Sequence, residues 1–405
     1  MSNGQVMRLR LWAVSQMQRS SALRACVGLL YGALRLVIPT NLKQIGFVSS
    51  PDLSDNALAL FEKILELPRE RELRLVWLVK SLSASKKILR REFPNADLKN
   101  VSLITKNSLR GLMALLRCRY VFETHGIYGF AHFGRHQTIV NLWHGMPIKT
   151  IGAFDNKVLN DIPFMHYSIA TSEFFAGIIA KTFYLEPDCV FVTGLPRNEW
   201  LFQPEERYFA LKENREKLIV WLPTYRDSYI GDIRHDSSEG APDPLDAGTL
   251  AQLDEMLDGA GVLLVIKLHL MDLKNKQKWP AYRNIRIYTE SRFQAEGLNL
   301  YKLLACSDAL VTDFSSCAID YLLLNRPIGI FAPDKSFYTR GFIPGVLEKF
   351  ETVGQELRSI GELGEFMKSL PPPMKVTPDA EDLCRMDLRN PSQAILRAIG
   401  ITDIL

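Results

Sequence analysis

Short apolar, β-branched runs alternate with helical patterns along most of the chain. This alternation predicts parallel sheets built from βαβ units. In the first half we expect strands at residues 44–50, 73–80, 101–106, 119–125, 137–143, 166–171 and 189–194. In the second half we expect them at 218–222, 262–268, 285–288, 309–312 and 328–331. Two parallel sheets therefore follow one another along the sequence.

The helical patterns fall between these strands. Amphipathic spacing predicts helices at 55–67, 108–116, 250–257, 298–305 and 391–398. Residues 201–215 also show a helical pattern and form a natural hinge between the sheets. Residues 227–248 are polar and rich in Gly, Pro, Asp and Ser, which indicates a long loop of the kind that often carries function.

The length of 405 residues favours two domains. We expect a leader at 1–40, an acceptor-side Rossmann-like domain at 41–205, a donor-binding Rossmann-like domain at 206–370, and a linker with a last helix at 371–405. The predicted fold class is α/β, with two doubly wound Rossmann-like domains facing a cleft. This is a GT-B-type arrangement, preceded by an amphipathic helical leader.

The leader combines an apolar stripe with positive charge. Its stripe repeats every three or four residues until Pro39, at Leu23, Val27, Leu30, Leu34 and Val37. Residues 1–51 contain six basic and no acidic residues, so the net charge of +4 is +6 here and −2 in the remainder. We expect residues 1–40 to bind an anionic membrane surface from the cytoplasmic side, peripherally and without crossing it. The alternative is a helix that packs on the protein body.

Composition excludes several other classes. No apolar run reaches the roughly 20 residues of a membrane span. The six cysteines form no CxxC pair, which argues against a structural zinc site or a disulfide framework and fits a reducing compartment. The near-neutral body argues against a nucleic-acid partner.

Candidate chemistry lies where predicted strands end, because open α/β sheets bind ligands at the carboxyl ends of their strands. His144 follows such a strand and precedes Gly145, which allows a sharp turn. It is a candidate general base. Lys149, within one turn, is a candidate phosphate ligand. The simpler interpretation is a histidine that only hydrogen-bonds a loop.

Further strand ends supply hydroxyl groups and cations. Lys267 and His269 alternate onto one face and suit a departing diphosphate, unless they are merely an exposed strand end. The segment from Thr312 to Ser316 predicts a helix start, where backbone N–H groups bind phosphate or Ser315 or Ser316 simply caps the helix. Asp320, one turn later, could bind a ribose or glycerol hydroxyl.

Two arginines also follow strands, in Gly194-Leu-Pro-Arg197 and in Pro223-Thr-Tyr-Arg226, whose Thr224 we include in the site. Arginine suits bidentate binding of phosphate oxygens. No carboxylate pair sits at a strand end, and no His/Asp set has metal-ligand spacing. We therefore expect no metal and no cofactor, with cationic side chains stabilising the leaving group.

The ordered motifs together resemble the CDP-glycerol glycerophosphotransferase family, which includes teichoic acid primases, polymerases and capsule-synthesis relatives. The resemblance covers roughly residues 40–345 and includes Tyr338 and Arg340-Gly-Phe342, whose Arg340 we include among the substrate-binding residues. It is carried mainly by Leu142-Trp-His-Gly-Met-Pro-Ile-Lys149, Gly194-Leu-Pro-Arg197, Pro223-Thr-Tyr-Arg226, Lys267-Leu-His269 and Thr312-Asp-Phe-Ser-Ser-Cys-Ala-Ile-Asp320. One departure is Leu270, where the family usually has Pro.

The resemblance implies transfer of a polyol phosphate from a CDP-activated donor to a hydroxyl of a lipid-linked or polymeric acceptor, with release of CMP. It implies that His144 and His269 are the two essential histidines. It also implies that Ser315, Ser316 and Asp320 bind the donor. Two alternatives stay open: a GT-B glycosyltransferase that uses a nucleotide sugar, and a non-catalytic membrane scaffold of a polymer-assembly complex.

Overall fold

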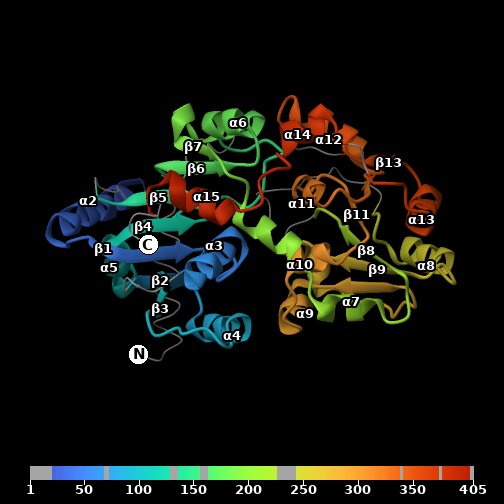
Figure 1. The fold of residues 1–405 in the computed structure, drawn as a ribbon, viewed down its shortest axis with the longest axis horizontal. Helices are drawn as coiled ribbons and strands as arrows, with labels where there is room; N and C mark the ends of the chain where they lie inside the picture. Colours follow the sequence, from blue (N-terminus) through green and yellow to red (C-terminus); the bar gives the residue numbers. More distant parts are fainter. Residues whose placement is uncertain are drawn as a thin grey trace. The chain divides into compact units, whose positions relative to one another are not determined.

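The computed structural model describes residues 21–67, 73–127, 136–155, 163–225, 243–337, 341–373 and 376–401. These residues form two parallel sheets with connecting helices (Figure 1). Within the described part, one compact unit contains residues up to His144, 163–168 and 400–401, and the other contains 145–155 and 169–399. The predicted α/β class with two Rossmann-like sheets is confirmed.

The first sheet has seven strands in the order β3-β2-β1-β4-β5-β6-β7. They are β1 Asn41–Val48, β2 Arg74–Val79, β3 Val101–Thr105, β4 Cys118–Glu123, β5 Thr138–Asn141, β6 Tyr167–Ala170 and β7 Val190–Val192. The residue range of each observed strand overlaps that of a predicted strand. Chain order reverses between β1 and β4, which are parallel neighbours. This is the topological switch point of a doubly wound sheet.

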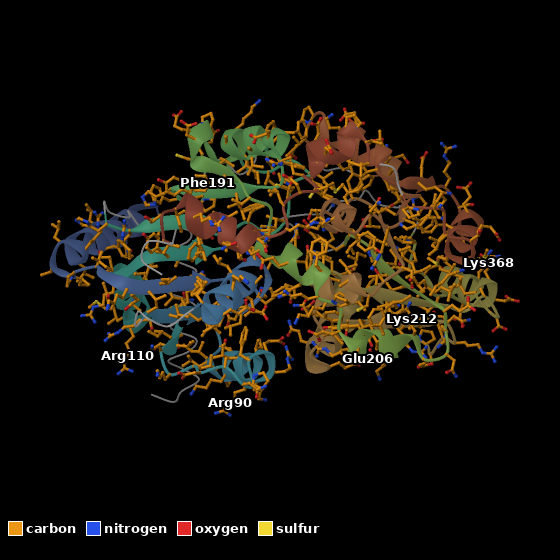
Figure 2. The ribbon with its side chains drawn as sticks, in the orientation of Figure 1. Arg90, Arg110, Phe191, Glu206, Lys212 and Lys368 are labelled. Carbon is orange, nitrogen blue, oxygen red and sulfur yellow. The ribbon has the colours of Figure 1, made fainter. Side chains whose placement is uncertain are left out.

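Within the described residues, four α-helices connect these strands: α3 Asp55–Glu66, α4 Leu82–Glu92, α5 Leu109–Arg117 and α6 Glu173–Phe183. Three of them begin at serines whose side chains accept a backbone N–H, namely Ser81, Ser108 and Ser172. Arg90 on α4 and Arg110 on α5 are exposed (Figure 2). Short 3₁₀ turns lie at η1 Gly152–Phe154 and η2 Pro187–Cys189.

The second sheet has six strands in the order β10-β9-β8-β11-β12-β13, all parallel. They are β8 Lys217–Leu222, β9 Val262–Lys267, β10 Ile285–Tyr288, β11 Ala309–Thr312, β12 Ile328–Phe331 and β13 Gln355–Leu357. The first five match predicted strands. The sequence did not predict β13, because it is three residues long and two of them are exposed. The switch point lies between β8 and β11.

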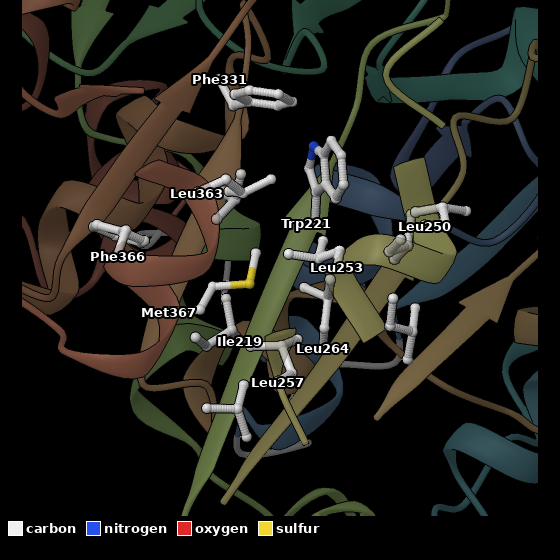
Figure 3. Packing of buried hydrophobic residues seen from close by; sticks show 14 of the residues in the cluster. Ile219, Trp221, Leu250, Leu253, Leu257, Leu264, Phe331, Leu363, Phe366 and Met367 are labelled. Carbon is white, nitrogen blue, oxygen red and sulfur yellow. The ribbon is translucent and has the colours of Figure 1, made fainter. Parts of the chain in front are cut away.

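Helices α8 and α13 supply much of the core against the second sheet (Figure 3). Trp221 of β8 and Leu264 of β9 pack in one cluster with Leu253 of α8 and Phe366 of α13. The helices and 3₁₀ turns that follow β8 along the chain are α8 Ala247–Met256, η5 Leu273–Lys276, α9 Glu290–Ala295, α10 Leu300–Ala305, α11 Cys317–Tyr321, η6 Leu322–Leu324, η7 Lys335–Phe337, α12 Val346–Thr352, α13 Ile360–Lys368, α14 Pro378–Leu383 and α15 Pro391–Ala398.

The predicted continuous helix at 201–215 is wrong. The chain instead forms η3 Pro196–Phe202, α7 Glu206–Phe209 and η4 Ala210–Lys212. Pro204 explains the break, because proline lacks the N–H that a helix interior needs and its ring clashes with the preceding turn. Along the sequence, the strands of the first sheet end before the expected domain boundary at 205–206, and those of the second sheet begin after it. The domain limits themselves remain predictions.

Helix α2, Ser21–Val37, forms part of the predicted leader at 1–40, of which residues 1–20 lie outside the described residues. Tyr31 is fully buried and packs with Leu116 of α5, as the alternative of a helix packed on the protein body predicts. However, Leu29, Leu36 and Val37 are 76%, 90% and 77% exposed. Helix α2 therefore has both a packed face and an exposed apolar face. No described helix has the length and apolar character needed to cross a membrane.

Candidate functional site

His144 lies just beyond β5, in a sharp turn. The sequence predicted this turn from Gly145 alone. Trp143 adopts φ +50° and Gly145 adopts φ +128°. The side-chain nitrogen of the buried Asn56 donates to the carbonyls of Leu142 (2.9 Å) and Trp143 (3.0 Å). The Asn141 side chain accepts the Trp143 N–H at 2.6 Å. Two asparagine side chains thus hold the turn that presents His144.

The hydrogen bond at the His144 ring determines its tautomer. Nδ1 lies 3.0 Å from the backbone carbonyl of Thr124, which can only accept. In the neutral ring Nδ1 therefore carries the proton, and the lone pair is on Nε2. The rings of His125 and Trp143 lie against the imidazole, at centroid distances of 4.0 and 4.1 Å.

The segment after β4 is fixed by a buried carboxyl group. Glu123 is fully buried, and its carboxylate accepts the N–H of Gly126. Burial raises the pKa of Glu123 to about 7, although backbone hydrogen bonds and Lys106 oppose this. Burial also lowers the pKa of Lys106. Sequence reasoning did not single out Glu123, His125 or Asn56, because their roles depend on partners from other strands.

In the second unit, Asp313 joins the loops that follow β8 and β11. Its carboxylate accepts the Thr224 hydroxyl at 2.7 Å and the Thr224 N–H at 3.1 Å. The buried Thr312 hydroxyl donates to the Leu222 carbonyl at 2.8 Å. The predicted substrate ligands Thr224 and Thr312 therefore use their hydroxyl groups to hold the switch point together. Asp313 is a site residue that the sequence pattern did not single out.

Ser315 and Ser316 are half-buried and precede α11, as predicted. The Ser315 hydroxyl accepts the Cys317 N–H at a long 3.4 Å, and the Ser316 side chain makes no cap hydrogen bond. The helix is short, five α-helical residues followed by η6. Plain helix capping therefore accounts for little of this segment.

Asp320 is fully buried rather than open to a ligand hydroxyl. Its Oδ2 accepts from Arg197 Nη2 at 2.7 Å and from the Tyr301 hydroxyl. The Arg197 guanidinium also lies over the Tyr301 ring, 4.7 Å from its centre. The structure thus brings two predicted ligands, Arg197 and Asp320, together as a buried ion pair. This pair ties η3 to α11.

Gly145 packs directly against this assembly. A Cβ atom added there would lie 2.3 Å from Ser316 Oγ and 3.0 Å from Arg197 Nη2. The first distance is shorter than real Cβ contacts, and the second is tighter than most of them, so that the Arg197 side chain would have to shift. The predicted glycine requirement therefore comes from close packing as well as from the turn.

We expect Gly145→Ala to lower thermal stability and to reduce turnover more than tenfold, since backbone strain of this kind costs about 1–3 kcal/mol. Melting temperature and initial rate would be measured together. Gly177→Ala, on α6 with nothing within 4 Å of the added carbon, is the matched control. Parent-like activity of Gly145→Ala would contradict the role of this contact.

Lys267 and His269 end β9 in different surroundings. The Lys267 ammonium donates to the Leu268 carbonyl at 2.9 Å and pairs with Glu290. Its charge is therefore already balanced within this unit. His269 is exposed, and its Nδ1 accepts the Met271 N–H at 3.1 Å. The proton of the neutral ring is therefore on Nε2, the reverse of His144.

The remaining predicted ligands are placed only in part. Lys149 forms an antiparallel backbone bridge with Phe342. Arg226 and Arg340 lie outside the described residues, as does most of the predicted loop at 227–248. In the part of the chain that the structure describes, no three His, Cys, Asp or Glu side chains gather as metal ligands would.

Comparison with known proteins identifies the family. Residues 30–377 match the model of CDP-Glycerol:Poly(glycerophosphate) glycerophosphotransferase. The chain belongs to the CDP-glycerol glycerophosphotransferase family. It is therefore an enzyme of the glycerophosphotransferase type, and the resemblance inferred from the motifs is confirmed.

Several relatives are teichoic acid polymerases, primases or transferases. The chain is 25% identical to a teichoic acid poly(glycerol phosphate) polymerase of Bacillus spizizenii over 76% of this chain and 78% of the relative. It is 23% identical to a Staphylococcus aureus teichoic acid glycerol-phosphate transferase over 79% and 77%. It spans only 47% of a B. spizizenii ribitol-phosphate primase and 42% of a Bacillus subtilis poly(glycerol phosphate) polymerase.

Solved structures show the same fold. A variant of the wall teichoic acid polymerase TagF soaked with CDPG has a TM-score of 0.72 and 18% identity, and covers 100% of this chain and 98% of that one. The S. aureus MnaA–UDP structure has a TM-score of 0.51 at 15% identity, and covers 90% and 98%. Both fit the Rossmann-like architecture described above.

Proposed function

We propose that this enzyme transfers glycerol phosphate, or a related polyol phosphate, from a CDP-activated donor to a hydroxyl group of a lipid-linked or polymeric acceptor. The observation that carries the proposal is the opposite tautomers of the two motif histidines. His144 has its lone pair on Nε2, whereas His269 has its proton there. One ring is suited to accept a proton and the other to donate a hydrogen bond.

In the proposed reaction His144 Nε2 takes the proton of the acceptor hydroxyl. The acceptor oxygen forms a bond to the outer phosphorus of the donor. The bond between that phosphorus and the bridging oxygen breaks, and its electron pair leaves with CMP. The Thr124 carbonyl, which accepts from Nδ1, stabilises the imidazolium that this transfer creates.

His269 Nε2–H donates to an oxygen of the diphosphate as negative charge grows on CMP. Phosphoryl transfer depends mainly on positioning and charge, so a fixed donor of this kind is valuable. Ser315 and Ser316, both half-buried at the carboxyl end of β11, complete the proposed phosphate site. Arg226, Arg340 and Lys149 remain predicted phosphate ligands.

We still propose that Asp320 binds a ligand hydroxyl, but only through its Oδ1 atom. Its Oδ1 is buried and has no hydrogen-bond partner among the described residues, while Oδ2 is paired with Arg197. Such an oxygen costs free energy unless it accepts a hydrogen bond. A ribose or glycerol hydroxyl of the bound donor would supply one.

A donor screen tests the proposal. Calorimetry would compare binding of CDP-glycerol, CDP-ribitol, UDP-glucose and GDP-mannose to the purified protein. We expect the CDP-polyols to bind and the nucleotide sugars to bind far more weakly. Preferential binding of a nucleotide sugar would favour the alternative glycosyltransferase. Binding of none of them would favour the scaffold.

We expect activity to persist in EDTA, because the groups that we assign to the phosphates are histidine, serine, arginine and lysine side chains rather than a bound metal ion. CMP release would be followed before and after chelation. Complete loss, restored by added magnesium or manganese, would show that a metal ion stabilises the leaving group.

We propose that an apolar face of α2 and α5 attaches the enzyme peripherally to the cytoplasmic face of the membrane. The α2 side chains Leu29, Leu36 and Val37 are strongly exposed, and so is Leu109 on α5. The two helices pack together through Tyr31 and Leu116. Arg110 on α5 is also exposed (Figure 2), and its basic group suits an anionic surface.

We expect the double change Leu36→Glu and Val37→Glu to weaken binding to phosphatidylglycerol vesicles about tenfold or more, because it replaces buried apolar contact by repulsion. Co-sedimentation of the full chain at low and high salt would measure this. Leu82→Glu, on α4 and 39% exposed, is the control. Equal binding by both variants would rule out this face.

A further inference from the structure

The ring of His125 lies flat on the ring of His144. Their centroids are 4.0 Å apart and their planes differ by 8°. The residue before His125 supplies the Thr124 carbonyl that accepts from His144 Nδ1. One short segment after β4 therefore restrains His144 both within its ring plane and across its face.

This segment is itself held firmly. The Thr124 hydroxyl lies 2.7 Å from His125 Nδ1, which fixes the His125 ring. Thr124 and Glu123 are fully buried, and the Glu123 carboxylate accepts the Gly126 N–H beyond His125. His125, by contrast, remains exposed on its outer side. An exposed ring with a fixed orientation contributes little to the core, so its stacking on His144 calls for another explanation.

We propose that His125 is a positioning residue for proton transfer at His144. Its ring fixes the plane of the His144 imidazole, and its neutral π face stabilises the imidazolium that forms when Nε2 takes the acceptor proton. This inference rests on the proposed function of His144 as the general base. It adds a residue to which neither the sequence motifs nor the comparisons give a function.

The neutral state of His125 is essential to this role, because a second positive charge at 4.0 Å would oppose protonation of His144. Although its outer side is exposed, the ring loses hydration where it packs against the protein, and this lowers the pKa of His125 most; the charges of His144, Lys106 and Lys80 act in the same direction. Asp55, at the start of α3, opposes them. Glu123 is buried on the same segment, two residues away.

Two variants of His125 distinguish a function in stacking on His144 from a purely structural function. We expect His125→Ala to lower kcat about tenfold to a hundredfold through misorientation of the base, with KM for CDP-glycerol unchanged. His125→Phe keeps a flat ring at the same place and should recover kcat to within about threefold of the parent. Melting temperatures should stay close to that of the parent, because the side chain is exposed.

A second readout does not require activity. NMR of histidine-labelled protein would follow the titration of the His144 ring, assigned with His144→Asn. We expect this titration to occur about half a pH unit lower in His125→Ala and to recover in His125→Phe, as loss of a ring-to-cation contact implies.

The two readouts distinguish failure of this proposal from failure of the proposed function. If the parent transferred no polyol phosphate from CDP-glycerol, the proposed function would be wrong, and the NMR titration would still decide the role of His125. If kcat and the His144 titration were both unchanged in His125→Ala, the positioning role would be overturned. Equal impairment of the Ala and Phe variants would overturn it as well.

Discussion

Replacing His144 with asparagine should lower turnover by about 10²–10⁴-fold, the usual effect of losing a general base. Affinity for CDP-glycerol should stay within about threefold of the parent, because we assign the donor phosphates to His269, Ser315 and Ser316. Asparagine retains a group at the Nδ1 position that can donate to the Thr124 carbonyl, 3.0 Å away in the parent. It lacks any group that can accept the acceptor proton at the Nε2 position.

Initial rates and calorimetric affinities would be measured on the same preparations. The control is His136→Asn, because His136 is exposed and its backbone carbonyl, which a side-chain change leaves in place, is the group that Arg119 binds. A His144→Asn variant with turnover within about threefold of the parent would remove His144 from the mechanism, whatever its tautomer.

Replacing Asp320 with asparagine should destabilise the protein by about 3–5 kcal/mol, because it removes the carboxylate charge that pairs with the buried Arg197 guanidinium. The two side chains are 5% and 0% exposed and lie 2.7 Å apart. Urea unfolding would measure the change. Combining Arg197→Met with Asp320→Leu should cost less than Asp320→Asn alone, since no buried charge then remains.

Glu66→Gln is the matched control for that experiment. Glu66 forms an exposed ion pair with Lys63 at 2.9 Å, and such pairs contribute about 0–1 kcal/mol. If Asp320→Asn cost no more than Glu66→Gln, the pair would not be an important link between η3 and α11. The Asp320 carboxylate would then be better interpreted as a donor ligand alone.

The strands could be predicted because each is a buried apolar run ending in polar residues. For example, β9 follows from five buried residues before Lys267, and β4 from its buried run up to Glu123. The prediction failed where tertiary context overrides local pattern. The three-residue β13 carries no apolar run, and the pattern at 201–215 concealed the break at Pro204.

The positions of site residues could be predicted better than their partners. His144, His269, Ser315 and Ser316 lie at strand ends, as the sequence indicated. The sequence could not show that Thr224 binds Asp313, 89 residues away, or that Arg197 binds Asp320, 123 residues away. A polar side chain that contacts protein looks the same in sequence as one that contacts a ligand. The sequence did not indicate the functions of Asn56 and His125 for the same reason.

The most direct test of the proposed function is product analysis with defined substrates. Purified protein would be incubated with CDP-glycerol and a lipid-linked disaccharide acceptor, with and without a first glycerol phosphate unit, and the products separated and weighed by mass spectrometry. We predict that acceptor mass rises by whole glycerol phosphate units and that one CMP appears for each unit added. Release of CMP without a heavier acceptor, or addition of a sugar from a nucleotide sugar in place of glycerol phosphate, would contradict the account.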